Sequence, residues 1–151
     1  MEDINSTLME IKKDFFRYKN GIVADSLKNI YPKETKILGL IAPQFMEIAN
    51  KYPKNLKLGL SLWNEKNNRE SRILALYLLP SDEINPDIAK EMILNIQSNE
   101  EAEILAFKIL RHLPYAKKLY AEMEDSPLNV PSVLYCIKMF KKNLETLDSF
   151  K

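Results

Sequence analysis

The chain has 151 residues, which is the usual length of one domain, and its hydrophobic and charged fractions are those of an ordinary globular protein. With 22 Lys and Arg against 21 Asp and Glu, it has no net charge that would draw the whole molecule onto nucleic acid. The single Cys136 and the single His112 exclude an internal disulfide and a zinc site built from several cysteines or histidines. We therefore expect one domain over residues 1–151, with no metal or cofactor, in a reduced cytoplasmic setting.

The composition favours helices, because only three glycines stand against many Leu, Ile, Lys, Glu and Asn residues. The first 16 residues lack a basic start followed by an apolar run, and no stretch of about 20 apolar residues occurs. We expect an all-α protein that is neither secreted nor bound to a membrane.

The first predicted helix covers residues 4–18, where apolar residues recur at steps of three or four: Ile4, Leu8, Ile11, Phe15 and Tyr18. The pair Asn20-Gly21 is typical of a helix C-terminus and is expected to end it. A second helix is predicted over residues 22–30, and the polar residues 31–36 are interpreted as a loop.

Three helices are predicted in quick succession between Gly39 and Pro80. Pro43 suits the first position of one helix, Asn55 can cap the next, and Asn67-Asn68 can cap the third. The leucine-rich residues 56–63 also fit a short strand, and a helix is the interpretation adopted. The third helix is apolar on most sides, so we expect it to be buried between neighbours.

After Pro80, helices are predicted over residues 86–97, 99–113 and 114–124. Ser126-Pro127 precedes the last helix, and Pro131 is an alternative start for it. The helix pairs that begin near residues 55 and 67, 86 and 99, and 114 and 127 repeat at intervals of roughly 30 residues. This spacing predicts a short solenoid of antiparallel helix pairs with a concave binding surface. A compact, non-repetitive helical bundle is the alternative.

Residues 39–46 (GLIAPQFM), the pair Leu62-Trp63 and residues 70–75 (ESRILA) together resemble two signatures of the AlkD-like DNA alkylation repair family. Those signatures are G-V-x-x-P-x-L-R and L-W-x(6)-E-x-R-x-L-A. Met46 stands where the family usually has arginine, and the chain is shorter than a full-length member. The resemblance implies a fold of HEAT-like repeats, an α-α superhelix.

Basic residues recur about one helical turn apart in the second helix of each predicted pair. If these helices stack side by side, the residues form a basic ladder that could follow a phosphate backbone. The alternative is that they are the ordinary solvated side of each helix. The basic ladder consists of Arg69, Arg72, Lys108, Arg111, Lys138, Lys141 and Lys142.

Glycosylase members of the family are understood to recognise a cationic alkylated base through a W-W-D-x-x-D motif, with a later arginine assisting. Residues 98–103 (SNEEAE) align with this motif, so that Glu103 stands at the second acidic position and Ser98 and Asn99 at the tryptophan positions. Lys138 lies near the expected place of the arginine. Glu103 could stabilise a developing sugar cation, but aromatic faces for a cationic base are missing. Alternatively, these glutamates oppose the dipole of a helix N-terminus.

These patterns lead to two functional hypotheses. The first is an AlkD-like protein that binds duplex DNA through its backbone and has an impaired or absent alkylpurine glycosylase centre. The second is a helical-repeat module without enzymatic activity, whose groove receives a peptide or helix of a partner protein. In both, we expect Trp63 and Cys136 to be packed in the core.

Overall fold

The computed structural model describes residues 3–125 and 129–149, and all regular elements in this part of the chain are helices. An isolated bridge between Lys36 and Asn68 is the sole β-type pairing among these described residues. The chain divides into two compact units, Met1–Leu79 and Pro80–Lys151. The all-α class is confirmed, and the expectation of one domain stays a prediction.

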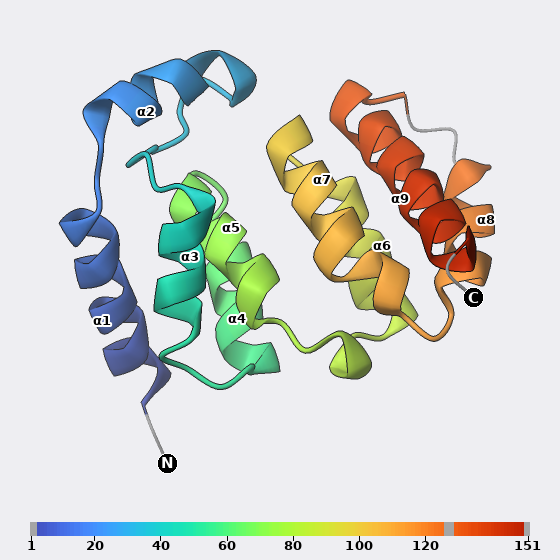
Figure 1. Cartoon of the computed structure of the whole chain (residues 1–151), viewed down its shortest axis with the longest axis horizontal. Helices are drawn as coiled ribbons and strands as arrows, with labels where there is room; N and C mark the ends of the chain where they lie inside the picture. Colours follow the sequence, from blue (N-terminus) through green and yellow to red (C-terminus); the bar gives the residue numbers. More distant parts are fainter. Residues whose placement is uncertain (1–2, 126–128, 150–151) are drawn as a thin grey trace. The chain divides into compact units, whose positions relative to one another are not determined.

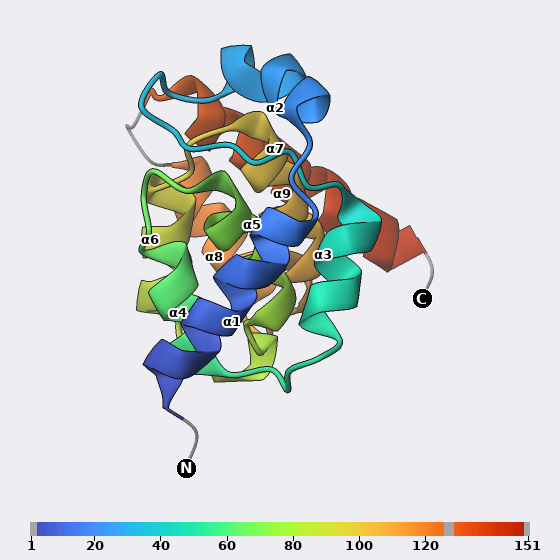
Figure 2. The ribbon, with the colours of Figure 1, turned by 90° about the vertical axis from the view of Figure 1, so that its left-hand side faces the viewer.

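The N-terminal unit contains α1 (Ile4–Arg17), α2 (Gly21–Leu27), a 3₁₀ turn (Lys28–Ile30), α3 (Ala42–Ala49), α4 (Leu56–Trp63) and α5 (Arg69–Leu78) (Figure 1). The helices α4 and α5 pack most extensively, and α3 also packs against α5. The Asn55 amide donates to the Leu78 carbonyl at 3.0 Å, so α4 begins where α5 ends and the two are antiparallel. In the view onto α1, this helix crosses in front of α5, with α3 on one side and α4 on the other (Figure 2).

The pair Asn20-Gly21 begins α2, and the prediction that it ends the first helix is wrong. The Asn20 side chain accepts hydrogen bonds from the amides of Ile22 and Val23, at 3.0 and 3.3 Å. Asparagine is favoured at both ends of helices, so the sequence alone did not separate the two roles. Gly21 does not take the left-handed conformation of a helix end, because Gly39 is the one glycine with a positive φ among the residues that the structure describes.

The segment between α2 and α3 folds onto the start of α5. The Lys36 amide donates to the Asn67 carbonyl, and the Arg69 amide donates to the Lys36 carbonyl at 3.0 Å. Gly39 has a φ of 94°, and a Cβ there would lie 2.2 Å from the Asn20 carbonyl oxygen. Glycine is therefore required at this position for both conformation and space.

The helix α5 is buried along almost its whole length, as its apolar pattern predicted. Its neighbours Trp63 and Leu62 on α4 and Phe45 on α3 are also buried. Asn68 precedes α5, but its side chain forms no capping hydrogen bond. The prediction that Asn67-Asn68 marks the start of this helix is confirmed, while a side-chain cap is not formed.

The C-terminal unit contains α6 (Pro86–Leu94), α7 (Asn99–Lys108), a 3₁₀ turn (Leu110–His112), α8 (Ala116–Glu124) and α9 (Pro131–Ser149). Pro131 begins the last helix, and Ser126-Pro127 lies outside the described residues. The predicted helix over residues 99–113 stops at Lys108 and tightens into the 3₁₀ turn. Pro114 explains this, because it holds Leu113 in an extended conformation with ψ of 136°.

Two pairs of parallel helices make up this unit. The helices α7 and α9 pack most extensively and run in the same direction (Figure 1). Lys90 of α6 pairs with Glu122 of α8 at 2.6 Å, and the Tyr115 hydroxyl donates to the Ile84 carbonyl, so α6 and α8 also begin at the same end.

From α4 onward, the starts of alternate helices recur at nearly constant intervals. The helices α4, α6 and α8 begin 30 residues apart, at Leu56, Pro86 and Ala116. Their successors α5, α7 and α9 begin at Arg69, Asn99 and Pro131. The interval of roughly 30 residues is confirmed, and a continuous HEAT-like solenoid stays a prediction.

Candidate functional site

Glu70, the glutamate of the 70–75 segment, is buried and binds the backbone of the loop between α2 and α3. The Glu70 carboxylate accepts the amide of Leu38 at 2.8 Å and that of Gly39 at 3.0 Å. It also pairs with Arg69 at 2.5 Å, and both side chains are buried. A buried carboxylate is stable only when its charge is paired and its oxygens are hydrogen-bonded, and both conditions are met.

The two arginines of α5 are bound to groups within the same unit. Arg69 donates to the Leu40 carbonyl at 3.0 Å and lies over the Phe45 ring. The Arg72 guanidinium lies 3.8 Å from the centroid of the Trp63 ring and donates to the Trp63 carbonyl at 2.8 Å. The exposed fractions of Arg69 and Arg72 are 3% and 1%. Their roles here are to hold the loop and to join α5 to α4.

The prediction that Arg69 and Arg72 contact phosphates is therefore corrected. Helical spacing places them on one face of α5, but that face is covered, so neither guanidinium can reach a phosphate backbone. The sequence contained a signal for the burial of these arginines. They lie in a stretch with a tryptophan and a glutamate at fixed spacing, and its apolar pattern predicts a buried helix. Trp63 is buried, as predicted.

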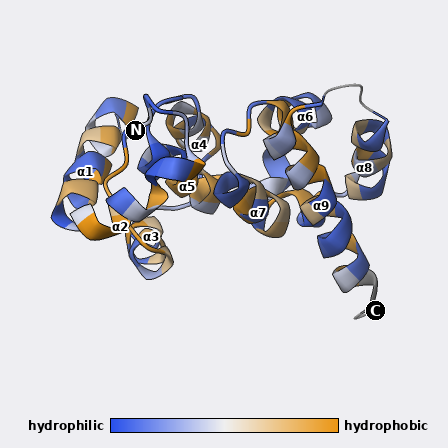
Figure 3. Cartoon of the chain, turned by 90° about the horizontal axis from the view of Figure 1, so that it is seen from above, coloured by the Kyte–Doolittle hydropathy of each residue, from blue (hydrophilic) through white to orange (hydrophobic). Residues whose placement is uncertain are grey.

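The three lysines of α9 lie on the surface. Lys138, Lys141 and Lys142 are exposed, whereas Val133, Cys136 and Phe140 on the other side of the helix are buried. Figure 3 shows the later half of α9 coloured mainly as hydrophilic. Within the described ranges, none of the three ammonium groups is paired with a carboxylate. We call these three residues the α9 lysine face.

Two further members of the basic ladder lie near the end of α7. Lys108 is half-buried and interacts with other residues. The Arg111 guanidinium lies 3.8 Å from the centroid of the exposed Phe107 ring, and its Nε donates to the Phe107 carbonyl at 2.7 Å. The turn that carries Arg111 packs against α9. The C-terminal unit thus places Arg111 and the α9 lysine face on two elements that touch.

Glu103, the catalytic candidate, is exposed on α7 and is bonded to Tyr135 of α9. The Tyr135 hydroxyl donates to the carboxylate, and this bond is the first cause that raises the pKa of Tyr135. Lys138 follows Tyr135 by one turn of α9, so the two candidates Glu103 and Lys138 are on facing helices. With its carboxylate held by a phenol, Glu103 can act as a fixed negative charge.

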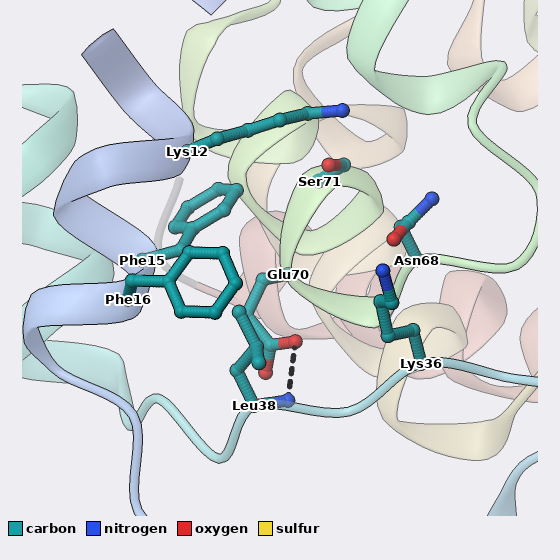
Figure 4. Close-up of a pocket in the computed structure, with 8 residues that line it drawn as sticks. All are labelled: Lys12, Phe15, Phe16, Lys36, Leu38, Asn68, Glu70 and Ser71. Atoms are coloured by element: carbon teal, nitrogen blue, oxygen red, sulfur yellow. Dashed lines mark hydrogen bonds between the residues drawn. The ribbon is translucent and has the colours of Figure 1, made fainter. Parts of the chain in front are cut away.

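A pocket of about 80 Å³ lies in the N-terminal unit, where no sequence motif indicated a site (Figure 4). Its wall includes Phe15 and Phe16 of α1, Leu38 and Lys36 of the loop, and Asn68 at the start of α5. These residues come from three segments far apart in the chain. No spacing in the sequence indicates that they meet.

Among the described residues, no cluster of three or more His, Cys, Asp or Glu side chains could hold a metal ion. In the same part of the chain, no helix is long and apolar enough to cross a membrane. No protein-family model, curated protein or solved structure matches the chain.

Proposed function

We propose that the protein binds duplex DNA through the phosphate backbone, using the α9 lysine face. The observation that carries this proposal is that Lys138, Lys141 and Lys142 are all exposed, without a carboxylate partner in the described ranges. Such ammonium groups are free to neutralise phosphates and release condensed counterions. With a net charge of +1, the chain has little long-range attraction, so we expect weak, sequence-independent binding of about 10⁻⁴–10⁻⁶ M.

The proposal includes a HEAT-like helical repeat as the scaffold. Three helix pairs with starts about 30 residues apart support it, as does the parallel packing of α7 with α9 and of α6 with α8. In such repeats, equivalent helices line one surface. In the proposed repeat, α7 and α9 together form the DNA-binding side.

The resemblance to AlkD-like glycosylases is retained as part of the proposal, with an impaired or absent glycosylase centre. Ser98 is buried and caps α7, because its hydroxyl oxygen accepts a hydrogen bond from the Glu101 amide at 3.1 Å. Neither Ser98 nor Asn99 supplies an aromatic face for a cationic base. Glu103 is already bonded to Tyr135. We expect little or no release of an alkylated purine, and no further loss in Glu103→Gln.

The experiment that tests DNA binding is a salt titration of affinity for a short duplex. Replacing Lys141 and Lys142 by glutamine should weaken binding at every sequence and reduce the salt slope by about 0.9 for each phosphate that is no longer neutralised. The matched control replaces Lys117 and Lys118, two adjacent exposed lysines of α8, by glutamine. Equal effects of the two double variants would contradict a specific role for α9.

A protein partner is the second candidate, because four large apolar side chains described in the C-terminal unit are exposed. Phe107 is 51% exposed, Leu134 44%, Val130 43% and Leu94 42%. An exposed aromatic residue beside basic residues is typical of surfaces that bind peptides or helices. If the native protein shows no salt-dependent DNA binding at low ionic strength, this candidate replaces the first.

A further inference from the structure

The pocket of the N-terminal unit combines one polar corner with an apolar wall. In the polar corner, the Lys36 ammonium points toward the side-chain amide of Asn68, on the side of its oxygen (Figure 4). Within residues 3–125 and 129–149, neither side chain is bonded to another residue. The backbones of Lys36 and Asn68 are joined in the isolated bridge, so the two residues lie side by side.

The other charges at the pocket are already balanced. Lys12 is paired with Glu65 at 2.6 Å. Glu70 is paired with Arg69 and accepts two backbone amides, so its oxygens are occupied and do not offer a cation site. Among the lining residues, the remaining charge is the single positive charge of Lys36, while Lys19 lies over the Phe16 ring at 5.8 Å from its centroid. A ligand that complements it carries one negative charge.

The opposite wall is apolar and partly open. It is formed by Phe15, Phe16 and Leu38. Phe15 is buried, whereas Phe16 is 59% exposed and presents part of its ring to solvent. When an apolar group covers an exposed aromatic ring beside a pocket, apolar surface is removed from water, which favours binding.

We propose that this pocket binds a small organic monocarboxylate with an apolar body. The pocket volume of about 80 Å³ accommodates the carboxylate and the adjoining carbon. The carboxylate accepts hydrogen bonds from the Lys36 ammonium and the Asn68 amide, and the apolar body covers Phe16 and Leu38. Bonds of this kind to a charged group are stronger than bonds between neutral groups. The site lies in the N-terminal unit and does not depend on DNA binding by α9.

The test uses phenylacetate as the probe and nuclear magnetic resonance of the full-length, isotopically labelled protein as the readout. We expect saturable millimolar binding with shifts of the Leu38 amide and of the amides of residues 68–71. Phenylacetamide, which has the same shape without the charge, and inorganic phosphate, which lacks the apolar body, should each bind at least about tenfold more weakly.

The variants separate this site from nonspecific association. Lys36→Met should lower the affinity for phenylacetate about tenfold or more, and Lys33→Met, at an exposed lysine in the same loop, should leave it unchanged. Because both substitutions leave the backbone bonds intact, the native spectrum should persist. The proposal is overturned if phenylacetate causes no saturable shifts, if phenylacetamide or phosphate binds equally well, or if Lys36→Met retains the native affinity.

Discussion

In the N-terminal unit, Arg69 and Arg72 of α5 are buried, whereas in the C-terminal unit Lys138, Lys141 and Lys142 of α9 are exposed. Both helices carry basic residues about one turn apart, and both follow another helix of their unit. The difference lies in the side chains and their partners. A guanidinium is planar and weakly hydrated, so it can leave water for a ring and a carbonyl, as Arg72 does with Trp63. An ammonium is strongly hydrated and stays at the surface unless it is paired.

The comparison teaches that regular spacing of basic residues is not enough to identify a nucleic-acid surface. In α5, the buried charges bind the loop between α2 and α3 and join α5 to α4. In α9, they are available to a ligand. This distinction between internal and external charges can be tested in four ways, from the largest expected effect to the smallest.

Glu70→Ala should lower the free energy of unfolding by about 3–5 kcal/mol, because it leaves a buried Arg69 without its carboxylate and removes the acceptor of two loop amides. Urea unfolding followed by circular dichroism measures the change. Glu34→Ala, at an exposed glutamate of the same loop, is the control and should stay within about 0.5 kcal/mol of the native protein. A loss below about 1 kcal/mol in Glu70→Ala would show that the carboxylate does not hold the loop.

Arg72→Met should lower the free energy of unfolding by about 2–3 kcal/mol, because the Trp63 ring loses its cation and the Trp63 carbonyl loses a buried donor. Trp63 is the only tryptophan of the chain, so its fluorescence should also change. The matched substitution Lys138→Met on the exposed face should alter neither measurement. Equal stability of the two variants would remove the distinction between internal and external charges.

The inward side of α9 can be tested through Cys136. Burial raises the pKa of its thiol to about 12, from an ordinary value near 9. Above pH 9, the unfolded chain loses the thiol proton while the folded chain keeps it, so stability falls as the pH rises. Between pH 8 and 10.5, this should lower the free energy of unfolding by about 2 kcal/mol.

Urea unfolding at pH 8 and 10.5, in the presence of a reducing agent, measures this change. In Cys136→Ala, the pH dependence should shrink by that amount. Tyrosines also ionise in this range, but their contribution is common to both proteins. An unchanged pH dependence in Cys136→Ala would mean that water reaches the thiol.

Replacing Lys138, Lys141 and Lys142 together by glutamine should change the free energy of unfolding by no more than about 0.5 kcal/mol, because all three side chains are exposed. The salt slope of DNA binding should nevertheless fall by about 0.9 for each phosphate that these lysines neutralise in the native protein. A clear loss of stability would indicate that these lysines have structural partners, and an unchanged slope would exclude them from the DNA surface.

The sequence by itself determined the helical class, most helix starts and the interval of about 30 residues. These features depend on local chemistry: Asn55, Asn85 and Ser98 each accept a backbone amide within their own first turn. It also determined that α5 and Trp63 are buried, because an apolar pattern on most sides of a helix leaves no side for solvent.

Only the tertiary structure decided which charges are internal. Arg69, Glu70 and Arg72 bind Leu40, Gly39 and Trp63, respectively. These partners lie 9 to 31 residues away along the chain, and the sequence does not indicate contacts over such separations. The same holds for the pocket, where α1, the loop and the start of α5 meet. Asn20-Gly21 shows the limit of local signals, because asparagine serves both ends of a helix. In the structure the Asn20 side chain caps α2, and the Asn20 backbone amide donates to the Leu38 carbonyl at 2.8 Å, where the loop meets the start of that helix.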